Sequence, residues 1–296
     1  MSTIAFIGLG NMGGGMAANL SKAGHDVRAF DLSSDAVNRA VSAGCTAAKS
    51  TLDALSGAEI VVTMLPAGQH VRGIYLGEDG IIAHVASGTL LIDSSTIDIG
   101  SARAVTQAAA DKGLSMVDAP VSGGVAAAVA GTLTFMVGGT KPAFAKAQKY
   151  LEKMGANIFH AGAAGNGQAA KVCNNMLLGI TMVGTCEAFA LAKKLGLDAQ
   201  TFYDISSTAS GQSWSMTSYC PAPGPVPSAP SNRDYEAGFT AAMMLKDMRL
   251  AGQAAAAVKV ATPLGAQAEA LYALMESAGK DDLDFSGIMK LIDGSL

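Results

Sequence analysis

A short apolar run followed by three spaced glycines opens the chain, and this feature limits its fold more than any other. Residues 2–7 predict a strand and residues 14–23 a helix, with the sequence Gly-Leu-Gly-Asn-Met-Gly between them. In such a unit the first glycine permits a tight turn, the second lets a pyrophosphate approach the backbone, and the third lets the helix pack against the strand. The helix N-terminus offers N–H groups and a partial positive charge to phosphates. The pattern predicts a dinucleotide-binding turn whose cofactor contacts are Gly8, Gly10, Asn11, Met12 and Gly13.

An acidic residue ends the second predicted strand. Residues 26–30 form that strand, and Asp31 follows at about the spacing from which an acid binds a ribose 2′-OH. The alternative is a purely structural glycine turn, with Asp31 capping the next helix. A carboxylate here repels a 2′-phosphate, and Arg28 precedes the acid rather than following it. The predicted cofactor is therefore NAD rather than NADP.

Further strand-like runs alternate with alanine-rich helical segments, at residues 60–65, 89–92, 115–117 and 133–137. This alternation predicts an α/β fold with a Rossmann-type, mostly parallel, doubly wound sheet. Ligands of such sheets collect beyond the carboxyl ends of the strands. That rule points to Leu65 and Pro66, to residues 94–96 and to residues 118–124.

The loops at the strand ends also have a simpler explanation, because Pro, Ser and Gly end strands for backbone reasons alone. The sequence Ser122-Gly123-Gly124 is an exception. Its hydroxyl and successive unobstructed backbone N–H groups suit a small carboxylate. We predict a substrate contact there.

Helical patterns dominate after Gly165, at residues 168–195, 199–208, 241–258, 263–278 and 285–292. The first would span roughly 40 Å. We expect a dinucleotide-binding domain over residues 1–164 and an all-helical substrate and oligomerisation domain over 165–296, beginning with a long interdomain helix. Five prolines between residues 219 and 233 predict either a surface linker or a loop that closes over the site.

One lysine stands beside two amides in the middle of the chain. On a helix, Lys171, Asn174 and Asn175 would share a face, and the residues after them are apolar almost all round, which predicts a buried helix. Hydride transfer needs a group that exchanges a proton with the substrate oxygen, and a lysine can fill that role. Alternatively, Lys171 reaches water and the asparagines are capping residues. Lys246 and Asp247 also interrupt an apolar helix, and the pattern alone favours a solvated edge.

Composition excludes several partners. The 296 residues favour two domains, and a net charge of −4 without a basic run argues against nucleic acid or an anionic membrane. Residues 172–192 are apolar enough to span a membrane, but they include polar residues such as Glu187, so a helix buried between domains or subunits fits better. We expect a homodimer or homotetramer.

Cysteine and histidine usage bears on metals and on the compartment. Four cysteines without Cys-x-x-Cys spacing and four histidines predict free thiols and no metal. A strand that begins almost at Met1 leaves no room for a targeting segment, so we expect a cytoplasmic protein.

Three long strings carry a family resemblance. Residues 6–13, residues 118–124 and residues 165–175 make the chain similar to the β-hydroxyacid dehydrogenases over essentially its whole length. The resemblance implies that Lys171 is the catalytic acid/base, that Asn175 helps to hold the substrate, and that residues 122–124 bind its carboxylate. It also implies cofactor contacts at Leu65, Pro66, Thr96 and Lys246, which reverses the solvated-edge interpretation of that lysine.

Residues 213–215, the proline-rich loop and residues 238–239 resemble the hydroxyisobutyrate branch of that family, with Trp214 as a wall of the substrate pocket. The implied reaction is NAD-dependent oxidation of 3-hydroxyisobutyrate to methylmalonate semialdehyde, a step of valine degradation. Open alternatives are reduction of tartronate semialdehyde, succinic semialdehyde or glyoxylate, and a non-catalytic dinucleotide-binding regulator. His70 and Cys220 depart from the family pattern, which often has asparagine there, and no role is assigned to either.

Overall fold

The computed structural model describes all 296 residues, and its contacts divide the chain into two compact units, Met1–Lys171 and Val172–Leu296. The division falls within helix α9 (Asn166–Lys194). The domain boundary that the sequence predicts, between residues 164 and 165, lies just before this helix.

The first unit is built on one nine-stranded sheet, in the order β3-β2-β1-β4-β5-β6-β8-β7, with β9 beside β8. The strands are β1 (Thr3–Ile7), β2 (Asp26–Phe30), β3 (Thr46–Ala47), β4 (Ile60–Thr63), β5 (Leu90–Asp93), β6 (Ser115–Asp118), β7 (Val121–Ser122), β8 (Leu133–Gly138) and β9 (Gly155–Gly162). Strands β1 to β6 pair in parallel, whereas β8 is antiparallel to β6 and β7. The predicted doubly wound sheet is confirmed. The sequence did not predict β3, β7 or β9, because two are only two residues long and β9 has little apolar periodicity.

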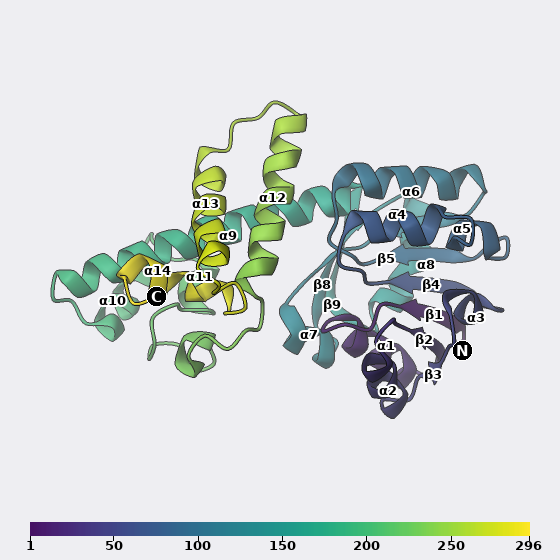
Figure 1. The fold of residues 1–296 in the computed structure, drawn as a ribbon, viewed down its shortest axis with the longest axis horizontal. Coiled ribbons are helices and arrows are strands. Elements are labelled where there is room, and N and C mark those ends of the chain that lie inside the picture. Colours follow the sequence, from purple (N-terminus) through teal and green to yellow (C-terminus); the bar gives the residue numbers. More distant parts are fainter. The chain divides into compact units, whose positions relative to one another are not determined.

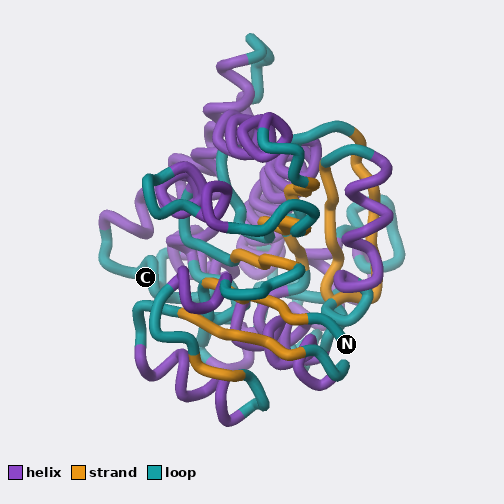
Figure 2. The backbone as a smooth tube through the Cα atoms, turned by 90° about the vertical axis from the view of Figure 1, so that its right-hand side faces the viewer, coloured by secondary structure: helices purple, strands orange, loops and turns teal.

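Helices cover both faces of this sheet. On one face lie α1 (Gly13–Lys22), α2 (Ser34–Ser42), α7 (Gly124–Ala130) and α8 (Lys141–Leu151), and on the other α3 (Thr51–Leu55), α4 (Gly68–Leu76), α5 (Ile81–His84) and α6 (Ile99–Asp111). Figure 1 shows α4, α5 and α6 along one side of the strands and α1 and α2 along the other, and Figure 2 shows the strands side by side.

Strand β1 shows how the two cores are built. Ile4 and Phe6 point into one core, and Ala5 and Ile7 into the other, because successive strand side chains face opposite ways. All four are at most 2% exposed. A strand buried on both faces reads as a continuous apolar run, which is why it was recognisable in the sequence.

The second unit is helical throughout. After its share of α9 it contains α10 (Ala199–Ser206), α11 (Trp214–Thr217), η1 (Pro230–Arg233), α12 (Ala241–Ala257), α13 (Pro263–Ser277), η2 (Phe285–Gly287) and α14 (Ile288–Asp293). Its core joins methionines and aromatic side chains of several helices, among them Met182, Met248, Tyr272 and Phe285. A Cβ on Gly179 would lie 2.7 Å from the Met248 sulfur, so the absence of a side chain lets α9 and α12 pack closely.

The proline-rich segment departs from its prediction at one point. The prediction is a linker or a loop, but the 3-10 helix η1 begins at Pro230. Proline is compatible with a first helical turn, because the N–H that it lacks has no acceptor within the helix at that position.

Helix α9 ends one residue before the predicted end at residue 195, and Gly196 lies in the left-handed region at φ +83, as helix C-caps often do. It is long and apolar enough to cross a membrane by length and composition alone, which is weak evidence because core helices pass the same test. Within the single chain this helix is not buried all round, since Leu177 and Leu191 are each 61% exposed, and its burial between subunits stays a prediction.

Candidate functional site

Four strands of the first unit end in one row across the sheet. Ile7 pairs with Thr63, Thr63 with Asp93, and Asp93 with Asp118. The loops that follow these residues therefore leave at the same sheet edge, where β1 lies between β2 and β4 and the strand order reverses. In open α/β sheets, this is where ligands bind. The sheet brings together the glycine turn, Leu65, Thr96 and the segment at 118–124.

The glycine turn fits a dinucleotide. Gly8 has φ +94, and a Cβ on it would overlap the Met64 carbonyl oxygen. A Cβ on Gly13 would overlap the carbonyl oxygen of Gly8. Gly10 differs, since a Cβ there would meet no protein atom within 4 Å, and its backbone is open to a ligand. Helix α1 begins next to this turn with no side-chain cap and no acid in its first turn, which suits a bound phosphate.

Asp31 is held beside the glycine turn. Its carboxylate accepts the Leu9 N–H at 2.6 Å and the Ser33 N–H at 2.8 Å. Ser33, not Asp31, caps helix α2 through its hydroxyl, so the alternative in which Asp31 is the helix cap is wrong. The geometry leaves Asp31 fixed at the carboxyl end of β2, where a ribose hydroxyl would be bound.

A buried acid that the sequence reasoning missed links the loops after β4 and β5. Asp93 Oδ1 accepts the Thr63 hydroxyl at 2.7 Å and the Ser95 hydroxyl at 2.6 Å. The Ser95 hydroxyl in turn accepts the Leu65 N–H at 2.8 Å. Burial raises the pKa of Asp93 to about 6, although these hydrogen bonds lower it. The signal in the sequence was an acid that directly ends a fully apolar strand.

The raised pKa of Asp93 predicts a pH-dependent stability. The Asp93 carboxyl ionises less readily in the folded than in the unfolded chain. Its ionisation therefore lowers the free energy of unfolding as the pH rises above the unfolded-state pKa, and the decrease is complete above about pH 6. Asp93→Asn keeps the Oδ1 acceptor and cannot ionise. Its unfolding free energy relative to the wild type should therefore rise by up to about 3 kcal/mol between pH 4 and pH 7. Denaturant unfolding at several pH values measures this, with the exposed Asp35→Asn as a matched control; a pH-independent difference would refute it.

Asp118 fixes the start of helix α9. Its carboxylate accepts the Gly165 N–H at 2.7 Å and the Gln168 N–H at 3.0 Å. The side chain is buried, and burial raises its pKa against the effect of these N–H groups. A negative group at a helix N-terminus interacts favourably with the helix dipole.

The predicted carboxylate-binding segment forms a strand-to-helix turn. Ser122 ends β7, Gly123 has φ +131, and helix α7 begins at Gly124. This helix has no side-chain cap hydrogen bond at its start. Ser122 is therefore two residues before the first residue of α7, a helix that has no side-chain cap.

Lys171 lies within α9 and is only 7% exposed, so the alternative in which it reaches water is wrong. Asn174 and Asn175 lie in the middle of this helix, which also excludes a capping role. Asn175 is 2% exposed and lies four residues after Lys171, on the same helix face.

A second acid that the sequence reasoning missed orients Asn175 in the helical unit. The Asn175 amide donates to Asp247 Oδ2 at 2.5 Å, and Asn175 Oδ1 accepts from Asn174 at 3.0 Å. Asp247 is 2% exposed, so its interpretation as a solvated edge is wrong. The Lys246 amine lies 3.5 Å from Asp247 Oδ1 and its side chain is 39% exposed.

Trp214 belongs to an aromatic column in the second unit. Its ring stacks on Tyr219 at 4.9 Å between centroids, and Tyr219 stacks on Phe285 at 5.3 Å. The Tyr219 hydroxyl donates to buried Asp284 at 2.9 Å. One face of this column reaches the surface, because Trp214 is 52% exposed.

The remaining candidate positions show no role in this chemistry. His70 is exposed on α4, and Cys220 is buried, with its pKa raised to about 11 by burial. All four cysteines are free, as predicted. No cluster of three or more His, Cys, Asp or Glu side chains suited to a metal is present.

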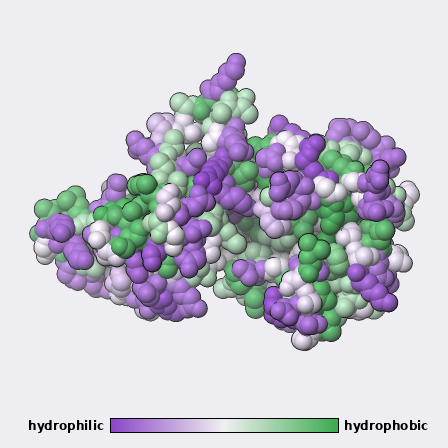
Figure 3. Space-filling view, viewed as in Figure 1, coloured by the Kyte–Doolittle hydropathy of each residue, from purple (hydrophilic) through white to green (hydrophobic).

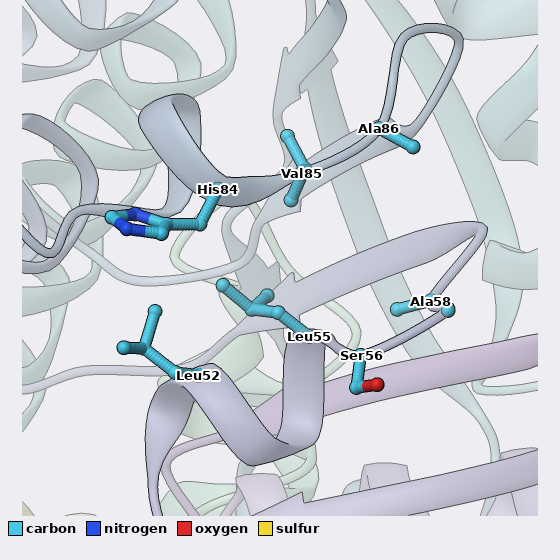
Figure 4. Close-up of a pocket in the computed structure, with 8 residues that line it drawn as sticks. Leu52, Leu55, Ser56, Ala58, His84, Val85 and Ala86 are labelled. Atoms are coloured by element: carbon cyan, nitrogen blue, oxygen red, sulfur yellow. The ribbon is translucent and has the colours of Figure 1, made fainter.

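A hollow of about 360 Å³ lies elsewhere in the first unit (Figure 4). It lies between Leu52 and Leu55 of α3 and His84 and Val85 near α5. Ala58, which also lines it, precedes β4, so this hollow lies at the amino ends of the strands. Ligands of doubly wound sheets bind at the other edge, and we assign the hollow no function.

Comparisons with known proteins agree with this geometry. Residues 3–162 match a family model described as the NAD binding domain of 6-phosphogluconate dehydrogenase, and residues 165–292 match one described as NAD-binding of NADP-dependent 3-hydroxyisobutyrate dehydrogenase. The chain is 54% identical to a 3-hydroxyisobutyrate dehydrogenase of Pseudomonas aeruginosa, with 99% of each chain covered. It belongs to the 3-hydroxyisobutyrate dehydrogenase family. The predicted resemblance to the β-hydroxyacid dehydrogenases is confirmed, and the chain is an oxidoreductase whose cofactor is NAD.

Other members of this dehydrogenase family differ in their named substrates. An NAD-dependent L-serine dehydrogenase of Pseudomonas aeruginosa is 52% identical, over 99% of this chain and 98% of its own length. A solved structure of a Mycobacterium tuberculosis 3-hydroxyisobutyrate dehydrogenase with L-serine is 47% identical, with a TM-score of 0.94 and 99% of each chain covered. The names of these relatives imply a small hydroxyacid substrate.

Proposed function

We propose that the chain oxidises 3-hydroxyisobutyrate to methylmalonate semialdehyde, a step of valine degradation, with Lys171 exchanging the hydroxyl proton. The observation that supports this proposal is a buried lysine one helical turn before a buried, oriented amide, Asn175. A bound NAD supplies the hydride acceptor. Neutral Lys171 accepts the proton of the substrate hydroxyl, and the ammonium returns it in the reverse direction.

The other side chains in this proposal bind rather than react. Ser122 with the backbone of Gly123 and Gly124 binds the substrate carboxylate through uncapped N–H groups at the start of α7. Asn174 and Asn175 hold the substrate oxygen, and Trp214 forms an apolar wall. The proposed NAD contacts are Gly8, Gly10, Asn11, Met12, Gly13, Asp31, Leu65, Pro66, Thr96 and Lys246.

L-serine is the second candidate substrate, because one close relative is named for it and the solved relative contains it. The two candidate substrates differ mainly at the α-carbon, which carries a methyl group in 3-hydroxyisobutyrate and an ammonium group in L-serine. An ammonium needs an acidic partner, and the buried acid nearest the proposed amides, Asp247, already contacts Asn175 and Lys246. This favours the methyl-bearing acid.

Initial rates on a panel of acids test the substrate. We expect kcat/KM for 3-hydroxyisobutyrate to exceed that for L-serine by about tenfold or more, since discrimination by one small group reaches 10–200-fold. The hydroxyacids are tested with NAD and NADP in parallel, and tartronate semialdehyde, succinic semialdehyde and glyoxylate are tested in the reducing direction with NADH and NADPH. A higher kcat/KM for L-serine would make L-serine the substrate in place of 3-hydroxyisobutyrate. NAD binding without turnover on any acid would favour the hypothesis of a non-catalytic dinucleotide-binding regulator.

We also propose a cytoplasmic homodimer or homotetramer, with the helical unit in the subunit interface. Exposed apolar side chains near the end of α9 and on α10, including Leu191, Leu195 and Ile205, support this proposal. Figure 3 shows hydrophobic surface at this end of the second unit. Solution mass measures the assembly.

A further inference from the structure

A buried glutamine joins the start of α9 to the loop after β5. Gln168 is 0% exposed. Its Oε1 accepts the Ile97 N–H at 3.0 Å, and its Nε2 donates to the Ser95 carbonyl at 2.7 Å. One side-chain amide thus bridges the backbone on both sides of Thr96, a proposed cofactor contact.

The bridge continues in both directions through buried groups. On the loop side, the Ser95 hydroxyl accepts the Leu65 N–H, so the loops after β4 and β5 are joined. On the helix side, the Gln168 N–H donates to Asp118. Two of the loops proposed to contact NAD are therefore tied to the first turn of α9 by an unbroken set of hydrogen bonds.

The backbone of this first turn packs closely against β6 and β8. A Cβ on Gly167 would overlap the Met136 carbonyl oxygen and would lie 2.6 Å from the Asp118 carbonyl oxygen. Lys171 follows Gln168 by three residues, which is about one turn of the same helix. A shift of the amide bridge would thus move the lysine relative to the Thr96 loop.

We propose that Gln168 is a positioning residue for the reaction, which sets the placement of the Thr96 loop relative to Lys171. This inference rests on the proposed function. A primary amide of this length supplies both the acceptor for Ile97 and the donor for Ser95 at any pH. Methionine has a similar volume but supplies neither, and an ionised glutamate would set a negative oxygen against the Ser95 carbonyl.

Gln168→Met tests the role of the bridge. We expect kcat to fall by about 10–100-fold, because misplacement by about 1 Å costs rates of that order. The Kd for NADH should change less than kcat. The primary kinetic isotope effect, measured with substrate deuterated at the carbon that bears the hydroxyl group, should rise, because hydride transfer becomes slower and limits the rate more fully. Hydrogen exchange of the segment containing Ile97 should become faster, because its N–H loses its acceptor.

Gln168→Glu adds a signature that a merely structural role would not produce. A protonated carboxyl can both accept from Ile97 and donate to Ser95, so lowering the pH restores both hydrogen bonds. We expect the ratio of its kcat to that of the wild type to rise by about fivefold or more as the pH is lowered from 9 to 6. Because burial raises the pKa of a carboxyl group, this rise should occur at a higher pH than the usual titration of glutamate.

Gln107→Met is the matched control, because this exposed glutamine on α6 bonds only to Asp111 within its own helix. It should leave every readout unchanged. A Gln168→Met enzyme with lower thermal stability but wild-type kcat and isotope effect would overturn the inference, as would a flat kcat ratio for Gln168→Glu. These results leave the proposed function standing, whereas an active Lys171→Ala enzyme refutes the role of the lysine.

Discussion

Lys171→Ala is expected to lower kcat by about 10²–10⁴-fold, the range that a positioned proton-transfer group contributes. The Kd for NAD should change by only a few-fold, because none of the groups proposed to bind NAD is removed. The physical reason is that the substrate hydroxyl loses the amine that takes its proton, whereas Asn175 stays held by Asp247. Steady-state rates with 3-hydroxyisobutyrate measure the first effect, and displacement of fluorescent NADH by NAD measures the second.

Lys194→Ala is the matched control, because this lysine lies exposed on the same helix. It should keep wild-type kcat. Circular dichroism of Lys171→Ala must show an intact fold, so that lost turnover reports chemistry. Turnover within a few-fold of the wild type in a folded Lys171→Ala enzyme would contradict the proposed mechanism.

Gly10→Ala is expected to raise the Kd for NAD by about 10–100-fold while leaving the fold intact. A Cβ at Gly10 meets no protein atom within 4 Å, so the unfolding free energy should change by less than about 1 kcal/mol. The same methyl group would occupy the space through which a pyrophosphate approaches the backbone. A steric cost of about 1–3 kcal/mol in the complex corresponds to that loss of affinity.

Two further glycine substitutions separate cofactor binding from folding. Gly13→Ala should lose stability as well as affinity, since its Cβ would overlap the Gly8 carbonyl oxygen. Gly73→Ala, on α4 with open space around its Cβ, should change neither. If Gly10→Ala binds NAD as tightly as the wild type, the proposed path of the pyrophosphate is wrong.

Much of the fold was predictable because its signals are local. Strand β1, the glycine turn and α1 are encoded by neighbouring residues, and β2 ends where predicted, just before Asp31. Helix α9 is predicted at residues 168–195 for the same reason, and it covers Asn166–Lys194 in the structure. Strand β9 was missed because it pairs only with β8 and carries exposed residues.

The two buried acids mark the limit of such reasoning in the site. Asp247 stands next to Lys246 in a helix whose pattern alone suggested a solvated edge, and its burial depends on packing against other helices. Asp93 ends an apolar strand, and nothing near it in sequence shows that Thr63, 30 residues earlier, donates to the same oxygen as Ser95. Each became visible only when distant segments were placed together.

The doubly wound sheet, the glycine turn and the helical second half can be inferred from the amino-acid sequence, because period, turn chemistry and capping act between residues close in the chain. How the proposed reacting groups are held depends instead on packing between segments that are far apart in the chain. The Asn175 amide meets Asp247 across 72 residues of sequence, and Gln168 meets Ser95 across 73. The physical reason is that a buried polar group must find its hydrogen-bond partner wherever packing brings one, and sequence spacing does not encode that partner.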